Sequence, residues 1–259
     1  MVLGEEGHQS GEGRSRTNID LPGLQKELLK EIKRVNKNIV LVVMSGRPLD
    51  LTWEDENIPA IVQAWQLGSK SGDAIAQVLY GDYNPSGKLT MSFPRNVGQV
   101  PIYYNFKNTG RPSTSIEQVT NSGYADVENS PLYSFGYGLS YTEFSYSDFE
   151  ISSDSMTKDS KINASVTVSN TGKFKGEEVV QLYLRDIVGS IARPMKELKG
   201  FEKIELAPGE SKVVNFEIDS SLLEFYTYEN KWEAEVGKFY AFIGTNSDVS
   251  DFKEFHLVK

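Results

Sequence analysis

The sequence predicts an α/β part followed by an all-β sandwich. In residues 1–100, apolar segments with helical spacing alternate with a continuous apolar run typical of a buried strand. In residues 146–259, short segments of alternating apolar and polar residues are separated by turns that contain Gly and Pro, which is the pattern of a β-sandwich. Residues 101–145 follow neither period and are rich in aromatic residues, so they predict an aromatic-rich linker.

The first helix is predicted just after Asp20, which can cap the helix with Pro22 in its first turn. The apolar residues that recur at helical spacing are Leu24, Leu28, Ile32 and Val35. Residues 38–46 (NIVLVVMSG) then form a continuous apolar run that is rich in Val and bounded by polar residues and Gly. A run of this length and composition is typical of a buried parallel strand.

The rest of the α/β part predicts short elements. Residues 58–66 (IPAIVQAWQ) indicate a short helix or turn, and residues 83–94 (YNPSGKLTMSFP) indicate a turn followed by a short strand. Between them, residues 70–81 predict a helix that ends with Gly81 in the C′ position. Its candidate caps are Ser71 and Asp73, and its apolar face comprises Ile75, Val78 and Leu79.

The β-rich part predicts at least four strands around one core. The four segments are residues 162–169, 179–186, 213–218 and 237–246. By alternation, the inward side chains are Ile162, Ala164, Val166 and Val168 on the first segment and Val214, Phe216 and Ile218 on the third. We expect one sandwich core that includes Val166, Leu182, Phe216 and Trp232.

The composition argues against several classes of function. Lys and Arg number 27 and Asp and Glu 36, which gives a net charge of −9 without a basic cluster for nucleic acid. Cys is absent, which excludes disulfides, thiol catalysis and thiolate metal sites. The two His are His8 and His256, so a His-rich metal site or a Ser-His-Asp triad is not expected unless His8 serves it. No metal and no cofactor is expected. No apolar run is long enough to span a bilayer, and the N-terminal residues do not have the pattern of a signal peptide.

The densest polar segment is residues 4–17 (GEEGHQSGEGRSRT), between a predicted strand and the first helix. Its chemically active side chains are Glu5, Glu6, His8, Glu12, Arg14 and Arg16. Open α/β sheets place ligands at loops of this kind, where Gly lets the backbone approach a ligand closely. The same residues also fit a solvated surface loop with loosely paired charges. A phosphate loop is a weak interpretation, because the Gly-Lys-Ser/Thr spacing is absent and carboxylates repel phosphate.

Three other features have both a functional and a structural interpretation. Arg47 and Asp50 can pair at the sheet edge or simply belong to a turn in which Pro48 fixes φ. Residues 108–112 (NTGRP) fit a binding loop or a plain turn. One aromatic set fits either a sugar-stacking surface or packing between two domains, and it comprises Tyr103, Tyr104, Phe106, Tyr133, Phe135, Tyr137 and Tyr141.

Eight motifs in the same order resemble the C-terminal half of family 3 glycoside hydrolases, the β-glucosidase and β-xylosidase family. They are SGEGRSRTNIDLPG, VVMSGRPLDL, AWQLGSKSGDAIAQVLYGDYNPSGKLTMSFPR, YYNFKNTGRP, PLYSFGYGLSYTEF, VSNTGKFKGEEVVQLYLRD, RPMKELKGFEKIELAPGES and the W-E-x-E-x-G-x-F pattern of residues 232–239. The resemblance implies that residues 1–100 are the C-terminal part of an α/β sandwich domain with an acid/base loop. It implies that residues 146–259 are a fibronectin type III-like (Ig-like) sandwich.

The resemblance also implies a retaining mechanism by double displacement. In this family an Asp on a preceding (β/α)8-like barrel is the nucleophile, and a Glu on a loop of the α/β domain is the acid/base. Glu12 matches the acid/base position, with Glu6 and Glu5 as rivals because the loop varies in length. Arg14 and Arg16 are expected to bind substrate or to orient the loop.

The sequence is therefore expected to supply the acid/base of a β-glucosidase that acts on β-linked glycosides or oligosaccharides. The barrel and the first part of the α/β sheet are expected to lie outside this sequence, so the barrel is the implied protein partner. The complete enzyme of the bacterial type is expected to be periplasmic or secreted. The alternative is a noncatalytic carbohydrate-binding or interaction module.

Overall fold

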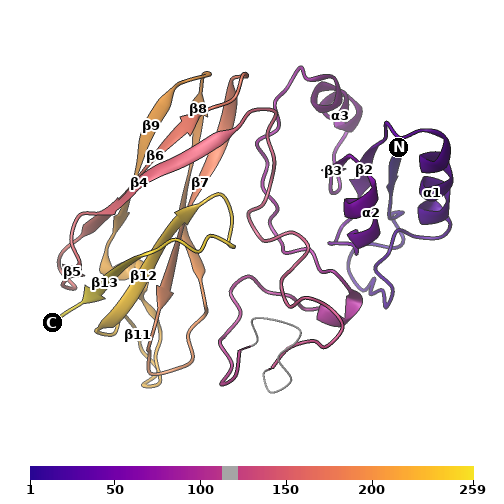
Figure 1. The fold of residues 1–259 in the computed structure, drawn as a ribbon. Coiled ribbons are helices and arrows are strands. Elements are labelled where there is room, and N and C mark those ends of the chain that lie inside the picture. The colour runs from indigo at the N-terminus through magenta and orange to yellow at the C-terminus, as the bar shows by residue number, and fades with distance from the viewer. Residues whose placement is uncertain (113–121) are drawn as a thin grey trace. The chain divides into compact units, whose positions relative to one another are not determined.

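The computed structural model describes residues 1–112 and 122–259, which form two compact units (Figure 1). The α/β unit contains Met1–Tyr83, Met91–Ile102 and residues 122–133, and the sandwich unit contains Asn84–Thr90, Tyr103–Pro112 and Ser134–Lys259. The predicted fold class, α/β followed by an all-β sandwich, is confirmed. Within the described parts of the chain, no helix is both long and apolar enough to cross a membrane.

The α/β unit is organised around a parallel sheet of three strands in the order β1-β2-β3. These are β1 (Val2–Gly4), β2 (Val40–Met44) and β3 (Ala60–Gln63). The central strand β2 has three buried residues in a row, as the continuous apolar run predicts. The prediction of a helix or turn over residues 58–66 is wrong, since β3 lies there and pairs with β2. Periodicity cannot separate a helix from a strand in so short an apolar segment.

The helices of this unit are α1 (Gln25–Val35), α2 (Thr52–Asn57) and α3 (Ser71–Tyr80). Asp20 does not cap α1, because that helix begins at Gln25 after Leu24 and has no side-chain cap. The carboxylate of Asp20 instead accepts a hydrogen bond from Lys26 at 3.4 Å. The predicted apolar stripe of α1 is mostly exposed, and Leu29 is the residue of the helix that is buried.

Helix α3 confirms one predicted terminus and corrects the other. Gly81 follows the helix with a left-handed φ of 81°, a conformation that favours Gly. At the N-terminus Lys70 occupies the cap position without a side-chain hydrogen bond, so neither Ser71 nor Asp73 caps the helix. The Asp73 carboxylate pairs with the Lys70 ammonium at 3.1 Å instead.

The predicted strand within residues 83–94 does not form. The described residues there form an isolated bridge between Phe93 and Tyr133, whose rings also meet edge to face at 5.8 Å. The 3-10 helix η1 (Val97–Gln99) follows. Two backbone hydrogen bonds of 2.8 Å connect Phe93 with Leu132 and Tyr133, so the amide and the carbonyl of Phe93 are both satisfied without a ladder.

The sandwich unit contains a five-stranded sheet in the order β5-β13-β12-β7-β8 and a three-stranded sheet in the order β4-β6-β9. The strands are β4 (Phe144–Ile151), β5 (Ser155–Met156), β6 (Ile162–Asn170), β7 (Gly176–Asp186), β8 (Glu197–Leu206), β9 (Ser211–Ile218), β12 (Gly237–Gly244) and β13 (Lys253–Leu257). The 3-10 helix η2 (Ser220–Leu223) follows β9, and β10 (Phe225–Tyr226) and β11 (Trp232–Glu233) form a separate hairpin.

One apolar cluster joins the two sheets of the sandwich. The predicted inward residues of β6 and β9 all belong to it, as does Leu182 of β7. Trp232 does not, because 66% of its surface is exposed on the hairpin. The prediction that Trp232 lies in the core is therefore wrong.

Some of the aromatic residues from the predicted linker pack within the sandwich unit. The ring of Tyr104 stacks on Phe135 with centroids 4.2 Å apart, and its hydroxyl accepts a hydrogen bond from the Leu198 amide at 3.2 Å. Tyr103 and Phe106 remain exposed. The stacked pair therefore fixes part of residues 101–145 to its own unit.

Candidate functional site

The carboxyl ends of the parallel strands β1 and β2 bring the polar loop of residues 4–17 beside Gly46 and Arg47. Gly4 ends β1 with φ 142°, and a Cβ there would lie 1.8 Å from the Met44 carbonyl oxygen. Only Gly permits this close approach of two strands. The Gln25 side chain donates to the Gly4 carbonyl at 2.9 Å and accepts from its amide at 2.7 Å, which fixes the start of the loop.

Glu5 is the buried anchor of the loop, with no exposed side-chain surface. Its Oε1 lies 2.9 Å from both Arg16 Nη1 and Arg47 Nε. Its Oε2 accepts a hydrogen bond from the Gly46 amide at 3.3 Å. Both carboxylate oxygens are therefore occupied by the protein, which gives Glu5 a positioning role in this arrangement.

Arg47 also clamps the far part of the loop. Its Nη2 donates to the carbonyl of Gln9 at 2.6 Å and to the carbonyl of Arg14 at 2.8 Å. Ser10 is buried between these points, and a Cβ on Gly46 would lie 1.9 Å from its hydroxyl oxygen. One guanidinium thus joins the start of the loop at Glu5 to both ends of residues 9–14.

Glu12 stands at the tip of the clamped segment. The Arg14 amide donates to the Gly11 carbonyl at 3.2 Å, which closes a turn with Glu12 and Gly13 in its centre. Gly11 and Gly13 have φ values of 117° and 70°. Within residues 1–112 and 122–259, the exposed Glu12 carboxylate has no hydrogen bond or ion pair. The turn thus presents a free carboxylate on a loop segment whose two ends are held by Arg47.

The remaining candidates of the loop lie in different surroundings. Glu6 is exposed and lies 3.2 Å from Nδ1 of His8, which is exposed as well. Arg16 is largely buried, and besides Glu5 it donates to the Asp20 carbonyl at 3.1 Å. Arg14 is exposed and is fixed through its backbone. The structure therefore gathers Glu5 and Arg16 at the base of the loop and leaves Glu12 and Arg14 at its outer side.

Sequence reasoning missed the roles of Arg47 and Gln25. Arg47 does not pair with Asp50, whose carboxylate accepts from the Thr52 amide at 3.0 Å. A usable signal for Arg47 was its place directly after the second parallel strand, at the same sheet edge as Glu5. Gln25 left no comparable signal, because a polar residue in the first turn of a helix is common.

A cavity of about 250 Å³ adjoins the C-terminal end of the loop. Its lining includes Asp20, Asp50 and Asn96. Glu54 of α2 is fully buried close to these carboxylates, and neither of its oxygens has a hydrogen-bond partner among the described residues. Burial raises the pKa of Glu54, against the opposing charge of Lys26, whose Nζ lies 3.9 Å from the carboxylate.

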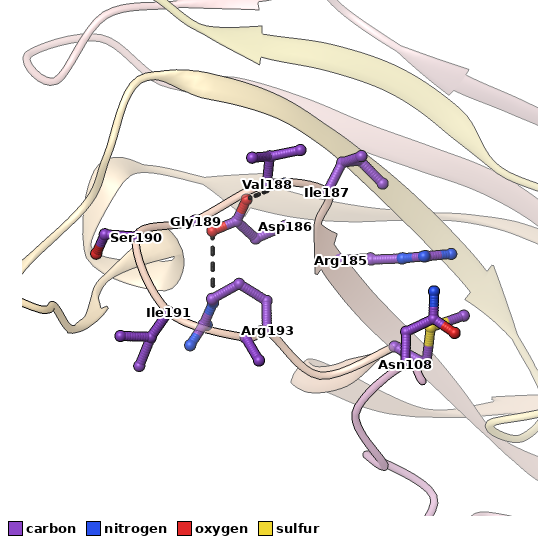
Figure 2. A pocket seen from close by; sticks show the side chains of 11 residues that line it. Asn108, Arg185, Asp186, Ile187, Val188, Gly189, Ser190, Ile191 and Arg193 are labelled. Carbon is purple, nitrogen blue, oxygen red and sulfur yellow. Dashed lines mark hydrogen bonds and ion pairs between the residues drawn. The ribbon is translucent and has the colours of Figure 1, made fainter. Parts of the chain in front are cut away.

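The sandwich unit has a separate cavity of about 330 Å³, shown in Figure 2. The Asp186 carboxylate on its wall lies 3.4 Å from Arg193 Nε, and burial raises the pKa of that carboxyl. The Arg193 guanidinium also stacks over Phe225, 4.0 Å from the ring centroid. In the described parts of both units, no group of three or more acidic, His or Cys side chains is placed to hold a metal.

Two family models match the chain. Residues 1–141 match the glycosyl hydrolase family 3 C-terminal domain, and residues 178–247 match the fibronectin type III-like domain. The first match includes the clamped loop, and the second lies within the sandwich unit.

Individual proteins that resemble this chain agree with the two family models. The chain is 52% identical over 247 residues to a periplasmic β-glucosidase of Salmonella typhimurium, which covers 95% of the chain and 32% of that relative. It is 42% identical over 253 residues to a β-glucosidase of Bacteroides ovatus, which covers 95% of the chain and 34% of that relative. A crystal structure of a Listeria innocua β-glucosidase with gluconolactone superposes with a TM-score of 0.94 at 39% identity, over 100% of this chain and 36% of that one.

The chain thus spans about a third of the length of the curated relatives it matches. More than half of its residues match the family 3 model, in the order in which the α/β unit and the sandwich occur here. The chain therefore belongs to glycosyl hydrolase family 3.

Proposed function

We propose that this chain supplies the general acid/base to a retaining β-glycosidase with β-glucosidase activity, and that Glu12 is that group. The observation that carries the proposal is the turn of residues 11–14, where an exposed carboxylate stands on a loop clamped by Arg47. Glu5 is fully occupied by Arg16 and Arg47, which argues against it as the acid/base. Glu6 is exposed but faces His8 within the loop.

The proposed chemistry uses Glu12 twice. Its carboxylic acid first protonates the glycosidic oxygen while a second carboxylate forms the glycosyl-enzyme, and its carboxylate then takes a proton from the attacking water. Retaining enzymes hold the two carboxyl groups about 5–5.5 Å apart. The proposed nucleophile is an Asp on the barrel domain of the complete enzyme. Arg14 is proposed to contact substrate from the outer side of the turn, and Arg16 to orient the loop through Glu5.

The names of the relatives support the sugar and the compartment. β-Glucosidases of Salmonella typhimurium and Bacteroides ovatus match almost the whole chain, and the former is named periplasmic. We extend this to β-linked glucosides or oligosaccharides as substrate, and to a periplasmic or secreted complete enzyme.

Azide rescue tests the assignment in the enzyme complemented with its barrel. Glu12→Ala is expected to lower turnover of substrates with poor leaving groups by about 10²–10⁴-fold, because those need protonation. An activated aryl glucoside still forms the glycosyl-enzyme, which then accumulates since water lacks its base. Azide needs no base, so it is expected to restore turnover and give the β-glucosyl azide.

Glu6→Ala is the matched control, because it removes an exposed carboxylate from the same loop. It is expected to show neither the leaving-group dependence nor the rescue. Rescue of Glu6→Ala without rescue of Glu12→Ala would transfer the role to Glu6.

A further inference from the structure

Arg185 of β7 is a half-buried cation without a counter-charge among the residues that the structure describes. Its guanidinium makes no hydrogen bond and no ion pair with any of them. Across the strand pair on one side, its direct partner is Tyr240 of β12. On the other side the pairing of β7 with β8 ends at Leu184 and Glu197, so Lys196 is the next residue in line. Neither of these two neighbours in the sheet supplies a carboxylate.

Lys196 brings a second positive charge to this part of the sheet. Its ammonium donates hydrogen bonds to the carbonyls of Ser247, at 2.9 Å, and of Val249. Burial lowers the pKa of Lys196, Asp248 opposes that shift, and the positive charge of Arg185 adds to it. Two cations that interact in this way repel each other, and a half-buried cation without an anion is costly to desolvate. An anion bound beside Arg185 would offset both costs.

Arg185 and Asn108 line the cavity of about 330 Å³ that Figure 2 shows. The segment that carries Asn108 is fixed there, because the Met195 amide donates to the Phe106 carbonyl at 2.8 Å. The Asn108 side chain makes no hydrogen bond with the described residues. Sites for small molecules commonly have volumes of about 300–1,000 Å³. The hydrogen-bond donors of Arg185 and Asn108 are therefore available in a hollow of suitable size.

The other charged side chains of the cavity wall are paired with each other. The Asp186 carboxylate lies 3.4 Å from Arg193 Nε and accepts a hydrogen bond from the Val188 amide at 3.2 Å. The Arg193 guanidinium also donates to Glu197 at 2.8 Å. Two arginines and one aspartate line the cavity, so its lining has a net charge of +1. Arg185 supplies the charge that is left after Asp186 and Arg193 have paired.

The loop of residues 187–193 adds backbone donors to the same cavity. The Ser190 amide donates to the Glu235 carboxylate at 2.7 Å, which fixes the loop. Three further amides of the cavity lining donate no hydrogen bond to the described residues, and they belong to Gly189, Ile191 and Ala192. The whole chain has a net charge of −9, which disfavours nonspecific attraction of anions. Anion binding at this cavity therefore depends on its local donors.

We propose that Arg185 and Asn108 form a site for a small oxyanion, which is a carboxylate or phosphate group on a ligand of about monosaccharide size. A planar guanidinium can donate two parallel hydrogen bonds to either group. The Asn108 amide and the free amides of the loop supply further donors. The site lies in the sandwich unit and uses no residue of the Glu12 loop, so it does not rest on the proposed function.

Isothermal titration calorimetry of the 259-residue chain tests the site with inorganic phosphate, glucuronate and glucose. Saturable binding of at least one of the two anions is expected, and glucose should bind at least tenfold more weakly because it has no charge. Tighter binding of glucuronate would assign the site to a carboxylate ligand, and tighter binding of phosphate would assign it to a phosphorylated one. Added NaCl is expected to weaken the binding of either anion.

Arg185→Ala is expected to weaken anion binding about tenfold or more, because hydrogen bonds between charged groups are the strong ones. Asn108→Ala removes an exposed side chain and is expected to weaken binding by a smaller factor. Arg34→Ala is the matched control, since it removes the same charge from a surface pair with Glu31 on α1. It should bind the anions as the unmodified chain does.

Thermal unfolding of each variant shows whether it is folded, and only folded variants are compared. The proposal would be overturned if neither anion bound saturably, or if glucose bound as tightly as the anions. Unchanged binding by folded Arg185→Ala would overturn it too, as would unchanged binding by Asn108→Ala if Arg185→Ala did not fold. The assay involves no hydrolysis and no barrel. Its failure therefore leaves the Glu12 assignment standing, and failure of azide rescue leaves the anion site standing.

Discussion

Nε of Arg47 lies 2.9 Å from Oε1 of the buried Glu5 carboxylate, across the carboxyl ends of two neighbouring strands. The same guanidinium holds the carbonyls of Gln9 and Arg14 through Nη2. The position of Glu12 therefore depends on an arginine 35 residues away in the chain (47 − 12), which follows a different strand.

Arg47→Ala is expected to destabilise the α/β unit by about 3–5 kcal/mol, because it leaves part of the charge of buried Glu5 without its partner. A urea titration of the intact chain measures the change. Arg34→Ala is the control, since Arg34 pairs with Glu31 on the exposed surface of α1 and such pairs contribute about 0–1 kcal/mol. Equal effects of the two substitutions would contradict the anchoring role.

Arg47→Lys tests whether the positive charge of residue 47 is enough to position Glu12, or whether the planar guanidinium is needed. Lysine keeps the positive charge but cannot bridge a carboxylate and two carbonyls with a planar fork. In the barrel-complemented enzyme it is expected to lower kcat for substrates with poor leaving groups more than for activated ones, because Glu12 is displaced. A uniform loss for both substrate types would show that Arg47 acts on folding alone.

The chain alone is expected to have no glycosidase activity. Retention requires two carboxyl groups, and the proposed nucleophile lies on the barrel domain. Release of 4-nitrophenol from 4-nitrophenyl β-glucoside is the measurement, with the barrel-complemented enzyme as positive control. Turnover by the purified chain would contradict the proposed division of the catalytic residues.

Phe216→Ala is expected to lower the stability of the sandwich unit by about 3–5 kcal/mol. The side chain is buried in the core between the sheets, so its removal leaves a cavity. Phe201→Ala should change stability by only about 0.5 kcal/mol, because that ring is exposed on β8. Differential scanning calorimetry distinguishes the two variants, and an unchanged transition in Phe216→Ala would contradict the assigned strand register.

Glu54 is expected to make the α/β unit less stable as the pH rises. Burial raises the pKa of Glu54 above 4.5 in the folded chain, so the folded state holds the proton more tightly than the unfolded state. This contribution is present below about pH 4.5 and is lost as the pH rises through the folded pKa. Glu54→Gln should remove this pH-dependent loss of stability, because the amide does not ionise in either state.

Urea titrations between pH 4 and pH 8 measure this difference. The exposed Glu27 of α1 supplies the control. Glu27→Gln should have the same dependence of unfolding free energy on pH as the unmodified chain. If the free energy of unfolding varied with pH in the same way for Glu54→Gln and the unmodified chain, the role of Glu54 in the pH dependence would be contradicted.

Local patterns predicted much of the fold. The apolar run around β2 predicts its burial, Gly81 predicts the end of α3, and the alternation in β6 matches its buried face. Such features are predictable because each depends on residues close together in the chain.

Features that depend on distant residues were not predictable in this way. The sequence predicts Trp232 in the core on the inward face of a strand, but the hairpin register directs it outward. The exposed stripe of α1 has helical spacing, yet spacing alone does not identify the buried face. In the candidate site, the polar loop was recognised from its composition, whereas the Arg47 clamp required knowing which strands are neighbours.

The sandwich unit also contains residues 84–90, far from its strands in the sequence. Lys88 from this segment pairs at 3.0 Å with the buried Glu178 of β7 and donates to the Gly138 carbonyl at 2.9 Å. A gene segment that encodes only the strands would leave Glu178 buried without its counter-charge. This sandwich is therefore poorly suited to transfer between proteins as an independent cassette, and we expect Glu178 and Lys88 to be inherited together.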